Sequence, residues 1–117
     1  MKVFFDEDVP RKLADFLPQH EVHTVVSMGW GGFRNGELLT LIEREGFQVF
    51  LTGDKNMASQ LQLAGWPFAV LIMSAINWLV VRPYVSRIAA ALDAVRPGVV
   101  QTIDCGVFVR RPARGEG

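Results

Sequence analysis

The sequence predicts an α/β protein with a mainly parallel sheet, and two observations support that fold class. Short apolar runs that suit buried strands alternate along the chain with segments whose apolar residues recur at helical spacing. The chain has 117 residues, of which 50% are hydrophobic, so it can bury one core and is too short for two. We expect a single domain over residues 1–109 and a flexible basic tail over residues 110–117.

The first third of the chain predicts two strands and two helices. Residues 2–5 form an apolar run typical of a buried strand, and Val9, Leu13, Phe16 and Leu17 then recur at helical spacing. Residues 21–25 are expected to form the second strand.

The next helix follows a glycine-rich loop over residues 29–32. Asn35 is a favourable N-cap, and three apolar residues with helical spacing come after it: Leu38, Leu41 and Ile42. Gly46 is expected to end this helix.

The rest of the chain continues the alternation. Residues 47–52 and 68–73 predict buried strands on either side of a short helix over residues 57–63. Residues 84–95 have clear helical spacing, whereas residues 74–82 give no clear pattern. Residues 99–103 and 107–109 predict two more strands, which could pair as a hairpin through Cys105 and Gly106.

The charged residues sum to zero but are unevenly distributed. Residues 1–54 hold nine acids and five bases, which gives −4, and the remaining residues give +4. Neutrality excludes a strongly basic nucleic-acid coat. The acidic start argues against a secretory signal, no apolar stretch is long enough to span a bilayer, and one cysteine cannot form an internal disulfide. We expect a cytoplasmic protein.

Acidic residues directly follow two of the predicted strands. Asp6 follows the first strand and Asp54 follows the strand over residues 47–52. Ligands of open parallel sheets bind beyond the carboxyl ends of the strands, where the strand order reverses. If these strands are neighbours, Asp6 and Asp54 face one crevice, which Asp8 and Glu37 can also reach.

Carboxylates crowded in this way repel one another unless a cation lies between them. Oxygen ligands suit Mg²⁺ or Mn²⁺, and such a site assists phosphodiester hydrolysis. A structural role is the alternative for each residue. Asp6, Asp8 or Asp54 can equally cap a helix, and Glu37 can interact with the dipole of its own helix.

Three segments together resemble a known family. Residues 3–10 (Val-Phe-Phe-Asp-Glu-Asp-Val-Pro), 28–39 (Met-Gly-Trp-Gly-Gly-Phe-Arg-Asn-Gly-Glu-Leu-Leu) and 50–56 (Phe-Leu-Thr-Gly-Asp-Lys-Asn) are similar, in this order, to motifs of small PIN-like proteins once filed as a domain of unknown function. The resemblance covers residues 2–104. It implies a three-layer α/β/α fold and a relation to VapC-type toxins, which are Mg²⁺- or Mn²⁺-dependent endoribonucleases of toxin–antitoxin pairs.

The resemblance also implies roles for individual residues. The family's acids fall on Asp6, Glu37 and Asp54, the expected catalytic and metal-binding residues, and Asp8 stands where the family usually has Asn. RNA is the implied substrate, an antitoxin protein the implied partner, and a homodimer follows by analogy only.

Several other residues could bind the substrate. Arg11, Lys12, Arg34 and Lys55 could hold phosphates, although each can equally be a solvated base. Trp30, surrounded by glycines, is the expected exposed aromatic that stacks on a base or anchors a partner.

Two other functions stay open from the sequence. Larger PIN nucleases have a further Asp downstream, and this chain has no acid between Asp54 and Asp93. That gap favours a non-catalytic PIN-like module that holds a protein or RNA. The less favoured alternative is a phosphatase of the haloacid dehalogenase type with Asp6 as nucleophile, for which the chain is short.

Overall fold

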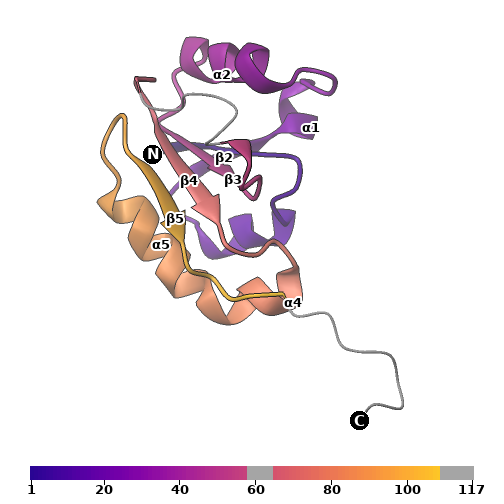
Figure 1. Ribbon diagram of the computed structural model, residues 1–117, viewed down its shortest axis with the longest axis vertical. Coiled ribbons are helices and arrows are strands. Elements are labelled where there is room, and N and C mark those ends of the chain that lie inside the picture. Colours follow the sequence, from indigo (N-terminus) through magenta and orange to yellow (C-terminus); the bar gives the residue numbers. More distant parts are fainter. Residues whose placement is uncertain (58–64, 109–117) are drawn as a thin grey trace.

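The computed structural model describes residues 1–57 and 65–108, and its centre is a five-stranded sheet (Figure 1). The strands are β1 (Lys2–Phe5), β2 (Glu21–Thr24), β3 (Val49–Thr52), β4 (Ala69–Met73) and β5 (Val100–Ile103). Every pairing is parallel and the order is β2-β1-β3-β4-β5. The predicted fold class, α/β with a mainly parallel sheet, is confirmed.

Helices cover both faces of this sheet, as Figure 1 shows. They are η1 (Arg11–Phe16), α1 (Val25–Met28), α2 (Asn35–Arg44), α4 (Trp78–Val81), η2 (Arg82–Tyr84) and α5 (Val85–Ala94). Alternate residues of each strand point to opposite faces. Val3 and Phe5 therefore pack toward η1 and α5, whereas Phe4 between them packs toward α1 and α2. The result is a three-layer domain with two hydrophobic cores.

The chain reverses its direction of travel across the sheet next to β1. From β1 it moves outward to the edge strand β2, then crosses back to β3 on the other side of β1. Val3 pairs with Val49 and Phe5 with Leu51, so β1 and β3 end side by side. This is the topological switch point at which parallel sheets bind ligands.

Most predicted elements are present within one or two residues of their expected bounds. The second strand stops at Thr24, one residue early, because Thr24 caps α1: its Oγ1 accepts a hydrogen bond from Ser27 N at 3.0 Å. The expected first helix is a 3₁₀ helix with Pro10 as its N-cap. Asn35 is wrong as the N-cap of α2, which begins at Asn35 and has Arg34 as its N-cap.

The predicted hairpin through Cys105 and Gly106 is also wrong. Val107 and Phe108 are in no strand, and β5 pairs with β4 in parallel. The hydroxyl of Ser74 accepts from Cys105 N at 2.9 Å and donates to Gly106 O at 2.6 Å. These two bonds hold the segment after β5 beside Ser74, directly after β4. The segment therefore does not turn back to pair with β5.

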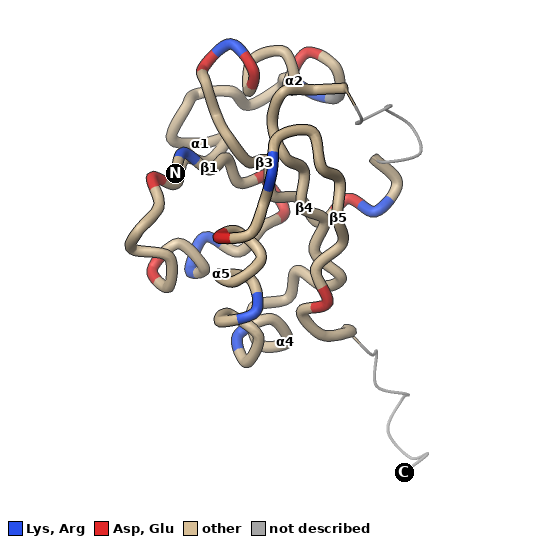
Figure 2. Tube along the Cα trace, turned by 90° about the vertical axis from the view of Figure 1, so that its left-hand side faces the viewer, with Lys and Arg blue, Asp and Glu red and all other residues tan. Residues whose placement is uncertain are grey.

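Some predictions fall outside the described residues. These are most of the helix over residues 57–63, Val109, and the basic tail over residues 110–117. Acidic and basic positions are interspersed along the described chain in Figure 2. No helix of the described residues is both long and apolar enough to cross a membrane.

Candidate functional site

Three aspartates gather where β1 and β3 end. Asp6 directly follows β1, Asp8 lies two residues further along, and Asp54 lies two residues after β3. The backbone pairing of β1 with β3 continues one residue beyond the end of β1, since Asp6 N donates to Leu51 O at 2.9 Å. All three side chains are half-buried. The predicted approach of Asp6 and Asp54 at the switch point is therefore what the structure shows.

Thr52 links two of these aspartates. Its hydroxyl donates to Asp6 Oδ2 at 2.6 Å and accepts from Asp54 N at 3.0 Å. Thr52 is the last residue of β3 and is fully buried, so this hydroxyl is held rigidly by the sheet. It fixes the orientation of Asp6 and the path of the chain that carries Asp54.

Asp8 reaches the same place from the loop after β1. Its Oδ1 accepts from Gly53 N at 3.1 Å. A Cβ at Gly53 would lie 3.1 Å from Asp8 Oδ2 and would collide with Cγ2 of Ile76, so glycine allows the carboxylate to approach the backbone. Burial raises the pKa of Asp8, the hydrogen bond from Gly53 N partly opposes this effect, and the charges of Asp6 and Asp54 raise the pKa further.

The capping alternative fits one aspartate only. No side chain caps η1, so neither Asp6 nor Asp8 caps the helix that follows them. Asp54 does make a local turn, because its Oδ1 accepts from Asn56 N at 3.0 Å. Its second carboxylate oxygen is not used in that turn.

A cavity of about 970 Å³ opens over the aspartates. Besides Asp6, Asp8 and Asp54 it is lined by two of the predicted substrate-binding bases, Arg34 and Lys55, which are both exposed. Three exposed apolar side chains also face it: Phe33, Ile76 and Phe108. The cavity thus combines acidic, basic and apolar surface in one place.

Other predicted residues lie elsewhere. Glu37 is exposed in the first turn of α2 and does not line the cavity, and neither do Arg11 and Lys12 of η1. The expectation of an exposed Trp30 is wrong. Gly29, with φ +70°, ends α1 and turns the chain back, and Trp30 packs against Phe4 with 5.2 Å between the ring centroids, leaving 9% of it exposed.

The sequence reasoning missed the residues that complete the site. Thr52 could have been found from its place beside Asp54 at the end of a strand, where a hydroxyl can bridge two neighbouring strands. Phe33 lies at the end of the same glycine-rich loop as Trp30 and takes the exposed position expected for Trp30. Ile76 and Phe108 carry no local pattern, because only the folded chain brings them to the cavity.

The donor set suits a cation held by few protein ligands. Among the residues that the structure describes, no three His, Cys, Asp or Glu side chains are arranged to enclose a metal ion. Mg²⁺ usually keeps several waters and binds one or two carboxylates together with substrate phosphates. Burial is the main cause of the raised pKa of Asp8, and the smaller contribution from the charges of Asp6 and Asp54 is what a bound cation would relieve. The aspartates therefore fit Mg²⁺ or Mn²⁺ shared with water and substrate.

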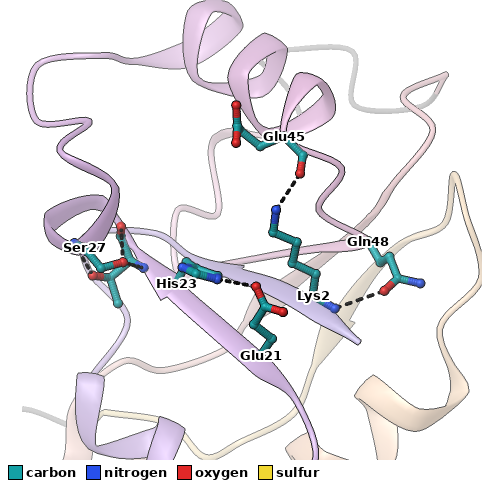
Figure 3. A network of polar contacts seen from close by, with 7 residues as sticks. Lys2, Glu21, His23, Ser27, Glu45 and Gln48 are labelled. Carbon is teal, nitrogen blue, oxygen red and sulfur yellow. Dashed lines mark hydrogen bonds and ion pairs between the residues drawn. The ribbon is translucent and has the colours of Figure 1, made fainter.

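A second polar group lies at the opposite end of the sheet (Figure 3). Lys2 starts β1, and its Nζ donates to Glu45 O at 2.6 Å while its backbone N donates to Gln48 Oε1 at 3.0 Å. On β2, His23 Nε2 lies 2.6 Å from Glu21 Oε2. This hydrogen bond is the main cause of the lowered pKa of Glu21, a fully exposed side chain.

Comparisons with known proteins identify no relative of this chain. No protein-family model matches the chain, and neither the curated proteins nor the solved structures include a match.

Proposed function

We propose that this protein is an Mg²⁺- or Mn²⁺-dependent endoribonuclease of PIN-like type, and that it acts in the cytoplasm as the toxin of a toxin–antitoxin pair. The observation that carries the catalytic part is the meeting of Asp6, Asp8 and Asp54 at the switch point, in a cavity also lined by Arg34 and Lys55. The toxin role, an antitoxin partner and a homodimer rest only on the resemblance of the three ordered motifs.

The aspartates would hold the cation directly or through water. A divalent cation at this place offsets negative charge on a phosphate and makes a water easier to deprotonate. Thr52 keeps the Asp6 carboxylate in a fixed orientation, which is the preorganisation that such a site needs.

The basic residues would position the substrate. Arg34 and Lys55 are exposed at the cavity, and neither forms an ion pair with any residue in the ranges 1–57 and 65–108. Such side chains bind phosphate oxygens without reading the base sequence. They would hold the RNA backbone while the aspartates face the phosphate to be cleaved.

The test is cleavage of single-stranded RNA with Mg²⁺ or Mn²⁺ by the wild type and by Asp6→Asn and Asp54→Asn. Both variants keep the shape of the side chain, and we expect each to lose activity by about 100-fold or more, the scale of removing one charge-stabilising group. Glu21→Gln is the matched control, because Glu21 is a carboxylate at the other end of the sheet. Equal activity of all four proteins would overturn the proposal.

Glu37 is tested in the same assay. Because it is exposed and away from the cavity, we expect Glu37→Gln to lower activity by less than about tenfold, against the 100-fold typical of a group that acts directly. A loss equal to that of Asp54→Asn would restore the role that the family resemblance implies for Glu37.

A non-catalytic module that holds RNA or a protein is the second candidate. It is favoured by the lack of a three-ligand metal group among the described residues. Calorimetric titration separates the two functions, since the module predicts no binding of Mg²⁺ or Mn²⁺ at millimolar concentration.

A further inference from the structure

Three apolar side chains are exposed on the wall of the acidic cavity. Phe33 follows α1, Ile76 follows β4 and Phe108 follows β5, so they come from three separate segments. Their exposed fractions are 44%, 40% and 59%. Only the fold brings them to the same cavity, and burying them elsewhere would have been favourable.

Phe33 and Phe108 differ from most other aromatic residues of the described chain, which are either buried or packed against another ring. Phe4, Phe47 and Trp30 form a cluster of rings under α2, and even the exposed Phe16 packs against Trp78, with 5.5 Å between the centroids. Phe33 and Phe108 pair with no other ring in residues 1–57 and 65–108. Both therefore present a ring face that no aromatic partner in these residues covers.

The apolar wall begins directly beside the aspartates. A Cβ added at Gly53 would touch both the side chain of Ile76 and the carboxylate of Asp8, so these two groups lie close to each other. A ligand that reaches Asp8 therefore also meets apolar surface. Arg34 follows Phe33 in the chain and lines the same cavity, which adds a positive charge next to that ring.

This surface suits a ligand with an anionic group and a flat apolar group a short distance apart. A nucleotide has both, in its phosphate and its base. Proteins bind single-stranded nucleic acid by stacking bases on aromatic rings while basic residues follow the backbone. Bases in a duplex are stacked on one another, and their faces cannot reach Phe33 or Phe108.

We propose that Phe33, Ile76 and Phe108 bind an unpaired base next to the phosphate that the aspartates face. This inference rests on the proposed function, because it takes RNA as the ligand. It adds that the substrate must be single-stranded at that position, and that the protein holds the base by its face without reading its edge.

The test measures binding separately from cleavage. The probe is a fluorescein-labelled RNA of eight adenosines, titrated with the full chain in EDTA and followed by fluorescence anisotropy. We expect Phe33→Ala and Phe108→Ala to weaken binding by about fivefold to 100-fold, the range for losing one stacked base. Phe33→Trp should bind at least as tightly as the wild type, since it keeps a stacking face.

Phe16→Ala is the matched control, because Phe16 is 49% exposed and does not line the cavity. It should bind as the wild type does. A set of probes, each with an abasic site at a different one of the eight positions, should bind the wild type more weakly than the complete RNA does. For Phe33→Ala and Phe108→Ala, the loss of affinity caused by the abasic site should be smaller. Unchanged binding by both variants, or an equal loss in Phe16→Ala, would overturn the inference.

The two proposals fail in different ways. If the RNA binds through the two rings but is not cleaved with Mg²⁺ or Mn²⁺, the nuclease is wrong and the base site stands. If RNA is cleaved at the wild-type rate by Phe33→Ala and Phe108→Ala at concentrations well below KM, the base site is wrong and the nuclease stands.

Discussion

The two ends of the parallel sheet use their charges in opposite ways. At the amino end, Lys2 is bonded to the carbonyl of Glu45 and Glu21 is bonded to His23. At the carboxyl end, Asp6, Asp8 and Asp54 come together, and none of them forms an ion pair with a residue in the described ranges. One end satisfies its charges within the chain, whereas the other leaves like charges close together.

The pKa shifts of Glu21 at the amino end and Asp8 at the carboxyl end have opposite signs. The bond from His23 lowers the pKa of Glu21, so ionised Glu21 favours the folded state. Burial and the neighbouring aspartates raise the pKa of Asp8, so ionised Asp8 opposes folding. Proteins accept such a local cost where a ligand compensates for it, and this supports the proposal of a functional site at the carboxyl end.

The largest expected effect is stabilisation by metal at the carboxyl end alone. A cation present at 100 times its Kd stabilises a protein by about 2.7 kcal/mol, which for a chain of this size raises Tm by on the order of 10 °C. Differential scanning fluorimetry with Mn²⁺ measures this shift. Asp54→Asn should lose most of it, and Glu21→Gln should keep all of it. An equal shift in these two variants would contradict a site at the carboxyl end.

The next largest effect is a difference in stability between substitutions at the two ends of β3. Thr52→Val removes the buried hydroxyl that bonds to Asp6 and Asp54, and we expect a loss of about 1–2 kcal/mol in the free energy of unfolding. Gln48→Ala removes an exposed bond to Lys2 just before β3, where water can replace it, so about 0.5 kcal/mol or less is expected. Urea denaturation of both variants measures the difference.

The activity of the same variants sharpens this comparison. Thr52→Val should lower RNA cleavage at temperatures where it is still folded, because Asp6 loses its orientation. Gln48→Ala should cleave RNA at the wild-type rate. If Thr52→Val kept full activity, Thr52 would be a structural residue only.

A smaller effect is expected from Asp8→Asn in EDTA. The amide oxygen can still accept from Gly53 N, while the repulsion from Asp6 and Asp54 disappears. We expect the free energy of unfolding at pH 7 to rise by about 0.5–1 kcal/mol, a modest value because the group is half exposed to solvent.

The pH dependence of that gain has a definite sign. The cost of ionised Asp8 is fully present above its folded pKa, becomes smaller as the pH falls toward its ordinary value of 3.8, and is absent below that value, where the group is protonated in both states. The difference in the free energy of unfolding between Asp8→Asn and the wild type, measured by urea denaturation, should therefore decrease as the pH is lowered toward 3.8. If Asp8→Asn were less stable than the wild type at pH 7, the expectation that ionised Asp8 opposes folding would be wrong.

The same two regions show what the sequence could predict. Asp6 and Asp54 were predictable because parallel strands end at one edge, and that rule needs only the strand bounds. The three inner strands β1, β3 and β4 were predictable because each is a short apolar run, whereas the edge strands β2 and β5 mix polar and apolar residues. The 3₁₀ form of η1 and the wrong N-cap at Asn35 show the limit of such rules, since local spacing does not fix the helix type or its first residue.

Trp30 and Phe33 show why the apolar wall was not predictable. Both follow glycines in the same loop, and local sequence cannot tell which ring enters the core. The turn at Gly29 decides it, by returning the chain toward Phe4 so that Trp30 is buried. Ile76 and Phe108 belong to segments that lie far from the aspartates in the sequence, so only the tertiary structure shows that they line the cavity.

The smallest expected effect is at the amino end, and it tests whether the two ends are electrostatically independent. His23→Phe removes the bond to Glu21 but keeps a ring against Phe47. The pKa of Glu21, followed by the carboxyl carbon shift in an NMR titration, should return toward its ordinary value of 4.5. The stability that the bond provides is present above pH 4.5 and is lost as the pH falls through the folded pKa, so any loss in the variant should appear only above that range. Because Asp8 lies at the other end of the sheet, its titration should be unchanged in His23→Phe. A shift of the Asp8 pKa in this variant would mean that the amino-end network acts on the aspartates, and the contrast between an independent structural end and a functional end would fail.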